Sequence, residues 1–243
     1  MKIINLTVRI SVIAVLTSSL YAQSVDEILA KHFEAVNQEK LSTINSLRLE
    51  ATMFMMGQEM PMTILQKRPN KIRSEVEIQG QKILTVYDGI EGWMVNPMMG
   101  SSEPQRIPPA QLENIVKQSD FFDSELVDYT GKGHTIEKLG DNEDEGNGAY
   151  VLQLNHKNGQ VFKFYIDKIN YMILKTSATV NNMGTEMEVE SYQKDYKKVD
   201  DIMFAHRLEI ESNGQNVQTT KISNIELNIS IKDNIFEKAS LTE

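Results

Sequence analysis

Hydrophobic and polar residues alternate along most of the chain after residue 46, the pattern of half-buried antiparallel strands. The first run extends from Leu47 to Met55, and after a turn at Gly57-Gln58-Glu59 a second extends from Met60 to Lys67. Asn158-Gly159 and Asn213-Gly214 are dipeptides favoured in type I′ hairpin turns. Further runs with this period cover residues 72–78, 82–87, 92–96, 103–107, 134–139, 149–156, 161–167, 171–180, 185–194, 202–212 and 215–227.

These runs amount to about a dozen short strands joined by tight turns, without the strand–helix–strand alternation of parallel sheets. The pattern predicts a mainly β (α+β) protein. We expect one meandering antiparallel sheet that curls into an incomplete barrel.

Three segments show helical spacing instead. Ser24-Val25-Asp26-Glu27 has the form of a capping box, and apolar residues follow it at helical spacing. A second short helix is expected from Glu39 to Ile44. After Pro108-Pro109, a third runs from Ala110 to Ser119. It places three apolar residues on one face, so it must lie over an apolar surface; these residues are Leu112, Ile115 and Val116.

Composition removes several classes of function. The chain has 243 residues, 34 of them acidic and 25 basic, and no Cys. Without Cys it has no disulfide, no thiolate zinc site and no thiol nucleophile. The formal net charge of −9 argues against nucleic acid as a partner, because no basic excess offsets the phosphate charge.

The first 22 residues have the features of an export signal. Lys2 and Arg9 precede a short apolar run from Ile10 to Leu20, and Ala22 is a small residue suited to a cleavage site. The run is shorter than the roughly 20 residues that span a bilayer. We therefore expect a signal peptide at 1–22, cleaved near Ala22, and a single domain at 23–243 located in the periplasm.

Little in the sequence indicates catalysis. The four His residues form no metal-binding pair at helical spacing, and the nucleophile-elbow, phosphate-loop and dinucleotide motifs are missing. The acidic loop that begins at Asp141 lacks the Glu of a calcium-binding loop, since Leu152 holds the twelfth position. We predict no catalytic residues, no metal and no cofactor.

Methionine is the unusual residue type, with 13 in the chain. Most of them are interpreted as core residues. The hairpin from Met53 to Met62 is different, because its tip is apolar on both faces; it contains Met53, Met55, Met56, Met60 and Met62. Met is flexible and polarizable, so it suits a surface that accepts varied apolar partners. A sheet face covered by one thin helix would leave a concave apolar space suited to a lipid chain.

Two strings give a family resemblance. Lys67-Arg68-Pro69-Asn70 is followed by Asp88-Gly89 and then by Gly92-Trp93-Met94-Val95-Asn96-Pro97. In this order and spacing the strings resemble the LolA/LolB-like periplasmic lipoprotein-carrier family. The N-terminal helix, the meandering strands and the mid-chain helix fit the same family. The resemblance covers most of the chain, although its specific motifs occupy only residues 66–97.

The resemblance implies a fold and a set of site residues. The fold is an incomplete antiparallel β-barrel with helices as a lid over a hydrophobic cavity, which takes the acyl chains of lipoproteins. Arg68 matches the Arg that bonds to the lid and holds it closed; the alternative is a surface charge at a strand end. The expected cargo cavity is lined by Met53, Met55, Met60, Met62, Trp93, Leu112, Ile115 and Val116.

The sequence thus predicts a non-enzymatic carrier that shuttles acyl chains of outer-membrane lipoproteins, or similar lipidic cargo, across the periplasm. An inner-membrane release machinery and an outer-membrane acceptor are the implied partners. The single Trp and the Met-rich hairpin depart from the family's carriers, which leaves open another lipid or an apolar peptide as cargo. Two alternatives remain: a lipid- or lipoprotein-sensing module of the same fold, and a hydrolase acting on lipids or glycans.

Overall fold

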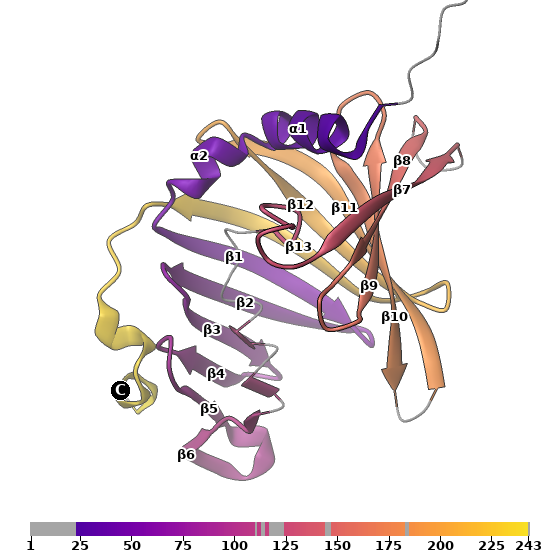
Figure 1. The fold of residues 1–243 in the computed structure, drawn as a ribbon. Helices are drawn as coiled ribbons and strands as arrows, with labels where there is room; N and C mark the ends of the chain where they lie inside the picture. The colour runs from indigo at the N-terminus through magenta and orange to yellow at the C-terminus, as the bar shows by residue number, and fades with distance from the viewer. Residues whose placement is uncertain are drawn as a thin grey trace, which may run out of the picture.

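The computed structural model describes residues 23–109, 111–112, 115–116, 124–143, 147–182 and 185–242. The predicted signal peptide lies outside this part of the chain. One large sheet dominates the structure and curls strongly, so that its inner face is concave (Figure 1). In the described residues, no helix is both long enough and apolar enough to cross a membrane.

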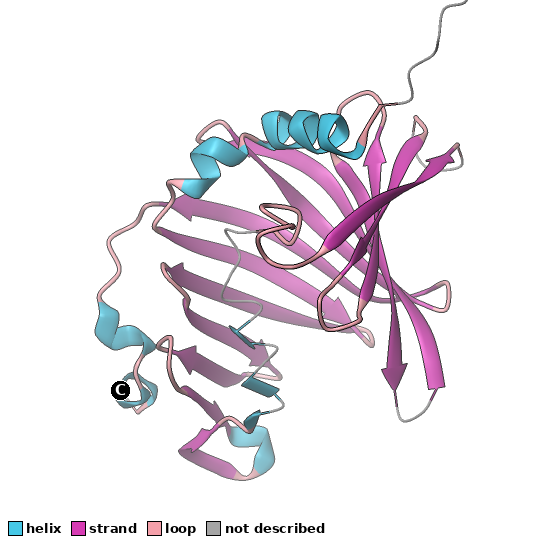
Figure 2. Ribbon diagram, viewed as in Figure 1, coloured by secondary structure: helices cyan, strands magenta, loops and turns pink. Residues whose placement is uncertain are grey.

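Helices are few and short, and α1 and α2 lie together across one end of the sheet (Figure 2). The helices whose bounds the structure describes are α1 (Val25–Val36) and α2 (Gln38–Ser42), with single 3₁₀ turns at Pro97–Met99, Asp233–Phe236 and Lys238–Leu241. The strands are β1 (Ser46–Met55), β2 (Gln58–Lys67), β3 (Lys71–Ile78), β4 (Gln81–Tyr87), β5 (Gly92–Asn96), β6 (Ser101–Arg106), β7 (Thr135–Asn142), β8 (Ala149–Asn155), β9 (Val161–Asp167), β10 (Ile173–Asn182), β11 (Thr185–Val199), β12 (Ile202–Ser212) and β13 (Gln215–Leu227).

The sheet consists of two antiparallel meanders joined in the middle. Strands β1 to β6 extend outward in chain order, and β7 to β13 return from the opposite edge until β13 pairs with β1. In the part of the chain that the structure describes, thirteen strands therefore form one sheet whose edges, β6 and β7, are not paired with each other. The prediction of a curved, incomplete antiparallel barrel with short helices is confirmed.

Helix α1 begins as its sequence predicts. The Ser24 hydroxyl accepts a hydrogen bond from the Glu27 N–H, and the Glu27 carboxylate accepts one from the Ser24 N–H, which completes the capping box. The helix ends at Asn37, whose left-handed conformation turns the chain into α2. Ile28, Leu29 and His32 are the residues of α1 that are buried against the sheet.

Two apolar clusters fill different parts of the inner face. The first joins α1 to β8, β9 and β10 and includes Leu126, which is fully buried and lies between the two meanders in sequence. The second surrounds the junction of β1, β12 and β13 and includes Ile44, the residue next but one after α2. Apolar burial of this kind contributes about 25 cal/mol per Å² and is the main term holding a chain without disulfides together.

The outer face of β1 to β5 is covered in part by the C-terminal segment, residues 228–242 (Figure 1). Lys67 donates hydrogen bonds to the Ile231 carbonyl at 2.8 Å and to the Asp233 carboxylate at 2.6 Å. Arg73 donates to the Ile235 carbonyl at 3.1 Å and to the Ser240 hydroxyl at 2.9 Å. Charged residues on the back of the sheet thus fix the end of the chain there.

Hairpin turns differ in detail from the prediction. Asn213 and Gly214 both have positive φ, as a type I′ turn requires, so that prediction is confirmed. At the other predicted turn only Gly159 has positive φ, and the Gly159 N–H donates to the His156 carbonyl, so the predicted type I′ turn there is wrong. The Asn158 N–H also donates to the His156 ring, which holds the longer loop in place.

Candidate functional site

An apolar groove follows the inner face of the sheet at the junction of the two meanders. Its outer hollow has a volume of about 340 Å³ and lies on β1, β2, β3, β12 and β13. Eight of its eleven lining residues are aliphatic or Met side chains. The eleven are Leu47, Leu49, Met53, Met62, Ile64, Gln66, Ile72, Leu208, Gln218, Thr220 and Ile222.

An inner hollow of about 280 Å³ continues the groove beneath α1 and α2. The two hollows share Leu49, Leu208 and Ile222, so they adjoin. Together they fall in the volume range of ligand pockets, roughly 300–1,000 Å³. The inner hollow is also lined by five neutral polar or titratable residues: His32, Gln38, Ser124, Gln193 and Tyr196.

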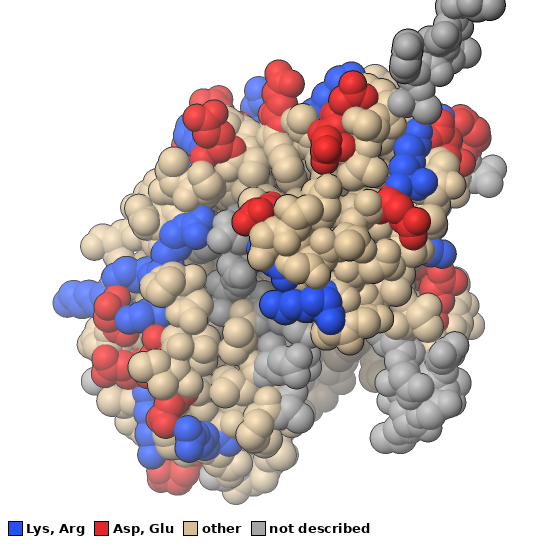
Figure 3. Space-filling view, viewed as in Figure 1, with Lys and Arg blue, Asp and Glu red and all other residues tan. Residues whose placement is uncertain are grey.

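The described lining of this groove is uncharged. Among the described residues that line the two hollows, none is Lys, Arg, Asp or Glu. By contrast, acidic and basic side chains intermingle over α1 and α2 on the outside (Figure 3). An uncharged apolar lining has no means of pairing an ion, so a charged group inside it would be strongly disfavoured.

The predicted methionines take three different places. Met53 and Met62 line the outer hollow. Met60 is buried but is not among the lining residues, and Met55 lies at the hairpin end with 37% of its surface exposed. The turn itself falls at Met56-Gly57, both with positive φ, so Met56 projects from the hairpin tip with 93% exposure.

Trp93 does not line the groove, and its assignment to the cargo cavity is wrong. Its neighbour Gly92 faces the inner side of β5, where an added Cβ would lie 2.6 Å from Leu112 Cδ1. Successive residues of a strand point to opposite faces, so Trp93 faces the outer side. There it packs in the cluster that contains Leu241, with Lys238 Nζ 4.3 Å from the ring centroid.

The predicted 110–119 helix is described in part. Residues 111, 112, 115 and 116 are helical; residues 110, 113, 114 and 117–119 lie outside the described part of the chain. Leu112 lies against Gly92 on the inner side of the sheet, and the Leu112 N–H donates to the Pro108 carbonyl at 2.9 Å. Ile115 is half-buried and Val116 is 37% exposed, and none of the three lines the two hollows.

Arg68 lies at the helix-bearing end of the groove. Its Nε donates a hydrogen bond to the Ile44 carbonyl at 2.8 Å, and its backbone N–H donates to the Asn45 carbonyl at 2.8 Å. Ile44 and Asn45 connect α2 to β1. The guanidinium therefore bonds directly to the connection that carries the two N-terminal helices.

His32 was not among the predicted site residues. It is 5% exposed, and its Nδ1 lies 2.8 Å from the Tyr171 carbonyl oxygen. A carbonyl only accepts hydrogen bonds, so Nδ1 carries a proton. Burial lowers the pKa of His32, although the bond to Tyr171 opposes this change, and the ring is therefore neutral at pH 7. Helical spacing from Ile28 to His32 was the signal that placed this ring on the inner face.

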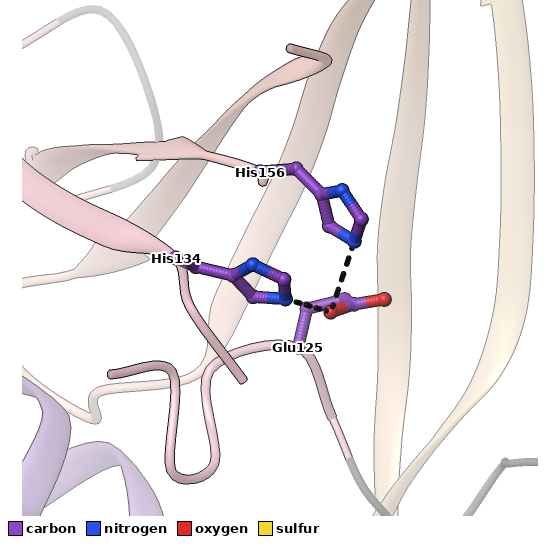
Figure 4. A group of neighbouring side chains, drawn as sticks. All are labelled: Glu125, His134 and His156. Atoms are coloured by element: carbon purple, nitrogen blue, oxygen red, sulfur yellow. Dashed lines mark hydrogen bonds and ion pairs between the residues drawn. The ribbon is translucent and has the colours of Figure 1, made fainter. Parts of the chain in front are cut away.

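A second His group lies beside the groove. Glu125 Oε2 is 3.0 Å from His134 Nε2 and 3.9 Å from His156 Nε2 (Figure 4). The centroids of the two imidazole rings are 4.1 Å apart. Two imidazoles and one carboxylate form a set that can hold a transition metal. Whether this group can bind a metal depends on which ring nitrogens carry protons.

Backbone N–H groups occupy both Nδ1 atoms. The Lys157 N–H donates to His134 Nδ1 at 3.3 Å, and the Asn158 N–H donates to His156 Nδ1 at 3.2 Å. Each neutral ring therefore carries its proton on Nε2, the atom that a metal would need. Metal-binding His residues normally donate their other N–H to an acceptor, so this group fits a metal poorly. We interpret it as a hydrogen-bonded clasp that holds residues 124–134 on the inner face.

Comparison with known proteins supports the fold. A family model described as "Uncharacterized protein" matches residues 66–243. The chain belongs to that family. Among curated proteins, no sequence matches it significantly.

Solved structures with the same fold have low sequence identity. A LolA superfamily protein from Nitrosomonas europaea is 17% identical, with a TM-score of 0.59 over 90% of this chain and all of its own. A putative outer membrane lipoprotein-sorting protein domain from Vibrio parahaemolyticus is 16% identical, with a TM-score of 0.58 over 89% of this chain and all of its own. A DUF1329 family protein from Desulfovibrio piger is 16% identical, with a TM-score of 0.60 over 88% of this chain and 98% of its own. The fold is LolA-like, which confirms the resemblance that residues 66–97 indicated.

Proposed function

We propose that this protein is a periplasmic carrier that shields the acyl chains of outer-membrane lipoproteins, or of similar lipids, in its groove. The observation that carries the proposal is the groove itself, an apolar space of two adjoining hollows that no charged residue of the described chain lines. Burying an acyl chain contributes about 0.8 kcal/mol per CH₂ group. Summed over the many CH₂ groups of a lipid chain, this is enough for the protein to bind the lipid from water.

Release of the cargo requires that the groove can open. Helices α1 and α2 cover the inner hollow, and Arg68 bonds to the connection that follows them. Displacing these helices costs free energy. The protein therefore binds its lipid cargo more weakly than burial of the acyl chain alone would predict. Arg68 is therefore the proposed lock of the lid, as in the family that the sequence resembles.

The remaining parts of the proposal follow from the same resemblance. Residues 1–22 direct export, an inner-membrane machinery loads the carrier, and an outer-membrane acceptor unloads it. No enzymatic step is part of this function. The groove offers no pair of carboxylates for acid–base chemistry among its described residues, which argues against the hydrolase alternative.

The test is recovery of cargo from the native source. Protein purified from the periplasm without detergent should carry lipids or lipoproteins that mass spectrometry identifies. It should also pass them to acceptor vesicles. A protein that carries no lipid, and binds no apolar dye when folded, would overturn the proposal. Lipid that stays bound without transfer would favour the sensing module instead.

A further inference from the structure

The inner hollow is lined by a hydrogen-bond acceptor to which no described residue donates. His32 lines this hollow and is neutral, with its one ring proton on Nδ1 and bonded to the Tyr171 carbonyl. Its Nε2 therefore has a free lone pair. Within the described part of the chain, no group donates a hydrogen bond to this atom.

The other polar groups of the inner hollow are also uncharged. Tyr196 Oη lies 2.9 Å from both the Ile173 carbonyl and the Gln193 side-chain oxygen, and burial raises the pKa of its hydroxyl, so it stays protonated. Gln38 and Ser124 complete the set. A carboxylate or phosphate in this hollow would lose its hydration and find no counter-charge among the described lining residues.

A hydrogen-bond acceptor that lines a largely apolar hollow, with no donor among the described residues, favours ligands that can donate to it. We propose that His32 Nε2 accepts a hydrogen bond from an uncharged donor, a hydroxyl or an amide N–H, on the polar end of a lipid in the groove. This inference rests on the proposed function. The donor end would lie beneath α1, and the hydrocarbon chain would extend along the outer hollow toward Met53.

The experiment compares four ligands with the same chain: dodecanol, dodecanamide, methyl dodecanoate and dodecanoate. Each competes with N-phenyl-1-naphthylamine, a neutral dye, at mildly alkaline pH. One hydrogen bond to a neutral group is worth about a three- to tenfold change in affinity. Dodecanol and dodecanamide should therefore compete about three- to tenfold better than the ester, which lacks a donor, and dodecanoate should be weakest. Comparing dodecanol with dodecanamide shows whether His32 accepts better from a hydroxyl or from an amide N–H.

The variant His32→Asn tests the residue. The Asn amide nitrogen occupies nearly the position of Nδ1 and can still donate to Tyr171, but nothing replaces Nε2. In this variant the alcohol and amide should fall to the affinity of the ester, while the ester binds as before. His206→Asn is the matched control, because His206 Nδ1 lies 3.0 Å from the Phe204 carbonyl and the residue lines neither hollow.

The outcomes separate the two proposals. If wild-type protein binds the alcohol and the ester equally, or if His32→Asn retains the preference, the role of His32 is wrong and the carrier function stands. If neither the dye nor any of the four ligands binds, the proposed function fails and the inference with it. The comparison of alcohol and ester in the wild type does not depend on whether the variant folds.

Discussion

Arg68 Nε donates a 2.8 Å hydrogen bond to the Ile44 carbonyl, and this bond joins the end of β2 to the residues that follow α2. The fork of the guanidinium presents several N–H donors in one plane, and a charged donor makes a stronger bond than a neutral one. Ile44 itself is buried in the cluster at the junction of β1, β12 and β13. Arg68 thus links the helices above the groove to the sheet below it.

This bond predicts how substitutions of Arg68 affect transfer. Arg68→Leu removes the donor, and Arg68→Lys keeps the charge but loses the planar fork. We expect the Leu variant to load cargo but to deliver it poorly, because an unlocked cover favours the loaded state, and we expect the Lys variant to lie between. The free energy of unfolding should change by about 1 kcal/mol. Lipid retention and transfer to vesicles measure the effect, and equal delivery by all three proteins would reduce Arg68 to a structural contact.

A carboxylate in the outer hollow should weaken lipid binding. Met53→Glu and Met62→Glu each place an acid in the apolar lining. Burying such a group without a partner costs about 1–3 kcal/mol, so the dye should bind about tenfold more weakly. Thr52→Glu is the control, because Thr52 lies next to Met53 on β1 and faces the opposite side of the sheet. It is paired with Lys221 of the neighbouring strand β13. Weakening by Thr52→Glu to the same extent would show that the effect is on the fold.

Alternation in the sequence predicted the sheet well, because each strand has one polar and one apolar face. It did not predict which strands are covered by another segment on their outer face as well. Trp93 appeared to face a cavity because only one apolar layer was expected. In fact the C-terminal segment forms another layer on the outer face, held by Lys67 and Arg73. Such contacts join residues more than 160 positions apart, and no local pattern encodes them.

Trp93 is therefore a reporter of the outer layer and not of the groove. Because it is the single Trp of the chain, its fluorescence is unambiguous. Saturating the groove with lipid should leave its emission wavelength unchanged. Leu241→Ala, which opens space beside the ring, should shift the emission to the red and lower the free energy of unfolding by about 2 kcal/mol. A red or blue shift on lipid binding by the wild type would place the ring in contact with cargo after all.

The clasp of Glu125, His134 and His156 was also hidden from local patterns. The three residues lie in two loops, and only the long segment between β6 and β7 brings Glu125 back to the hairpin that follows β8. His32 was different. Its spacing from Ile28 placed it on the buried face of α1, but a single His on an apolar face gives no sign of which ring nitrogen is free.

The clasp predicts that zinc does not stabilise the protein. A metal that binds the folded protein raises its stability by mass action. Since backbone N–H groups hold both Nδ1 atoms, we expect zinc ions in excess to leave the melting temperature of the wild type unchanged. Glu125→Gln should lower the melting temperature slightly, because the amide accepts a weaker hydrogen bond from His134. A zinc-dependent rise that His134→Gln abolishes would show a metal site instead.

The last prediction concerns pH and His32. Burial lowers the pKa of His32 in the folded protein, while the unfolded chain keeps the ordinary value of about 6.5. Between these two values the unfolded chain binds a proton and the folded protein does not. Lowering the pH therefore favours unfolding. The contribution of His32 to stability is fully present above pH ~6.5 and is lost progressively as the pH falls toward the lowered pKa.

The measurement is the free energy of unfolding in urea from pH 7.5 to pH 5. For one such group the slope cannot exceed about 1.4 kcal/mol per pH unit. His32→Asn removes this group but keeps the donor to Tyr171, so the variant should lose less stability over this range than the wild type. The other His residues are the same in both proteins, so their contributions cancel in the difference. Equal slopes for the two proteins would mean that His32 is reached by solvent and protonated in the folded state, which would also remove the basis for its role as a neutral acceptor.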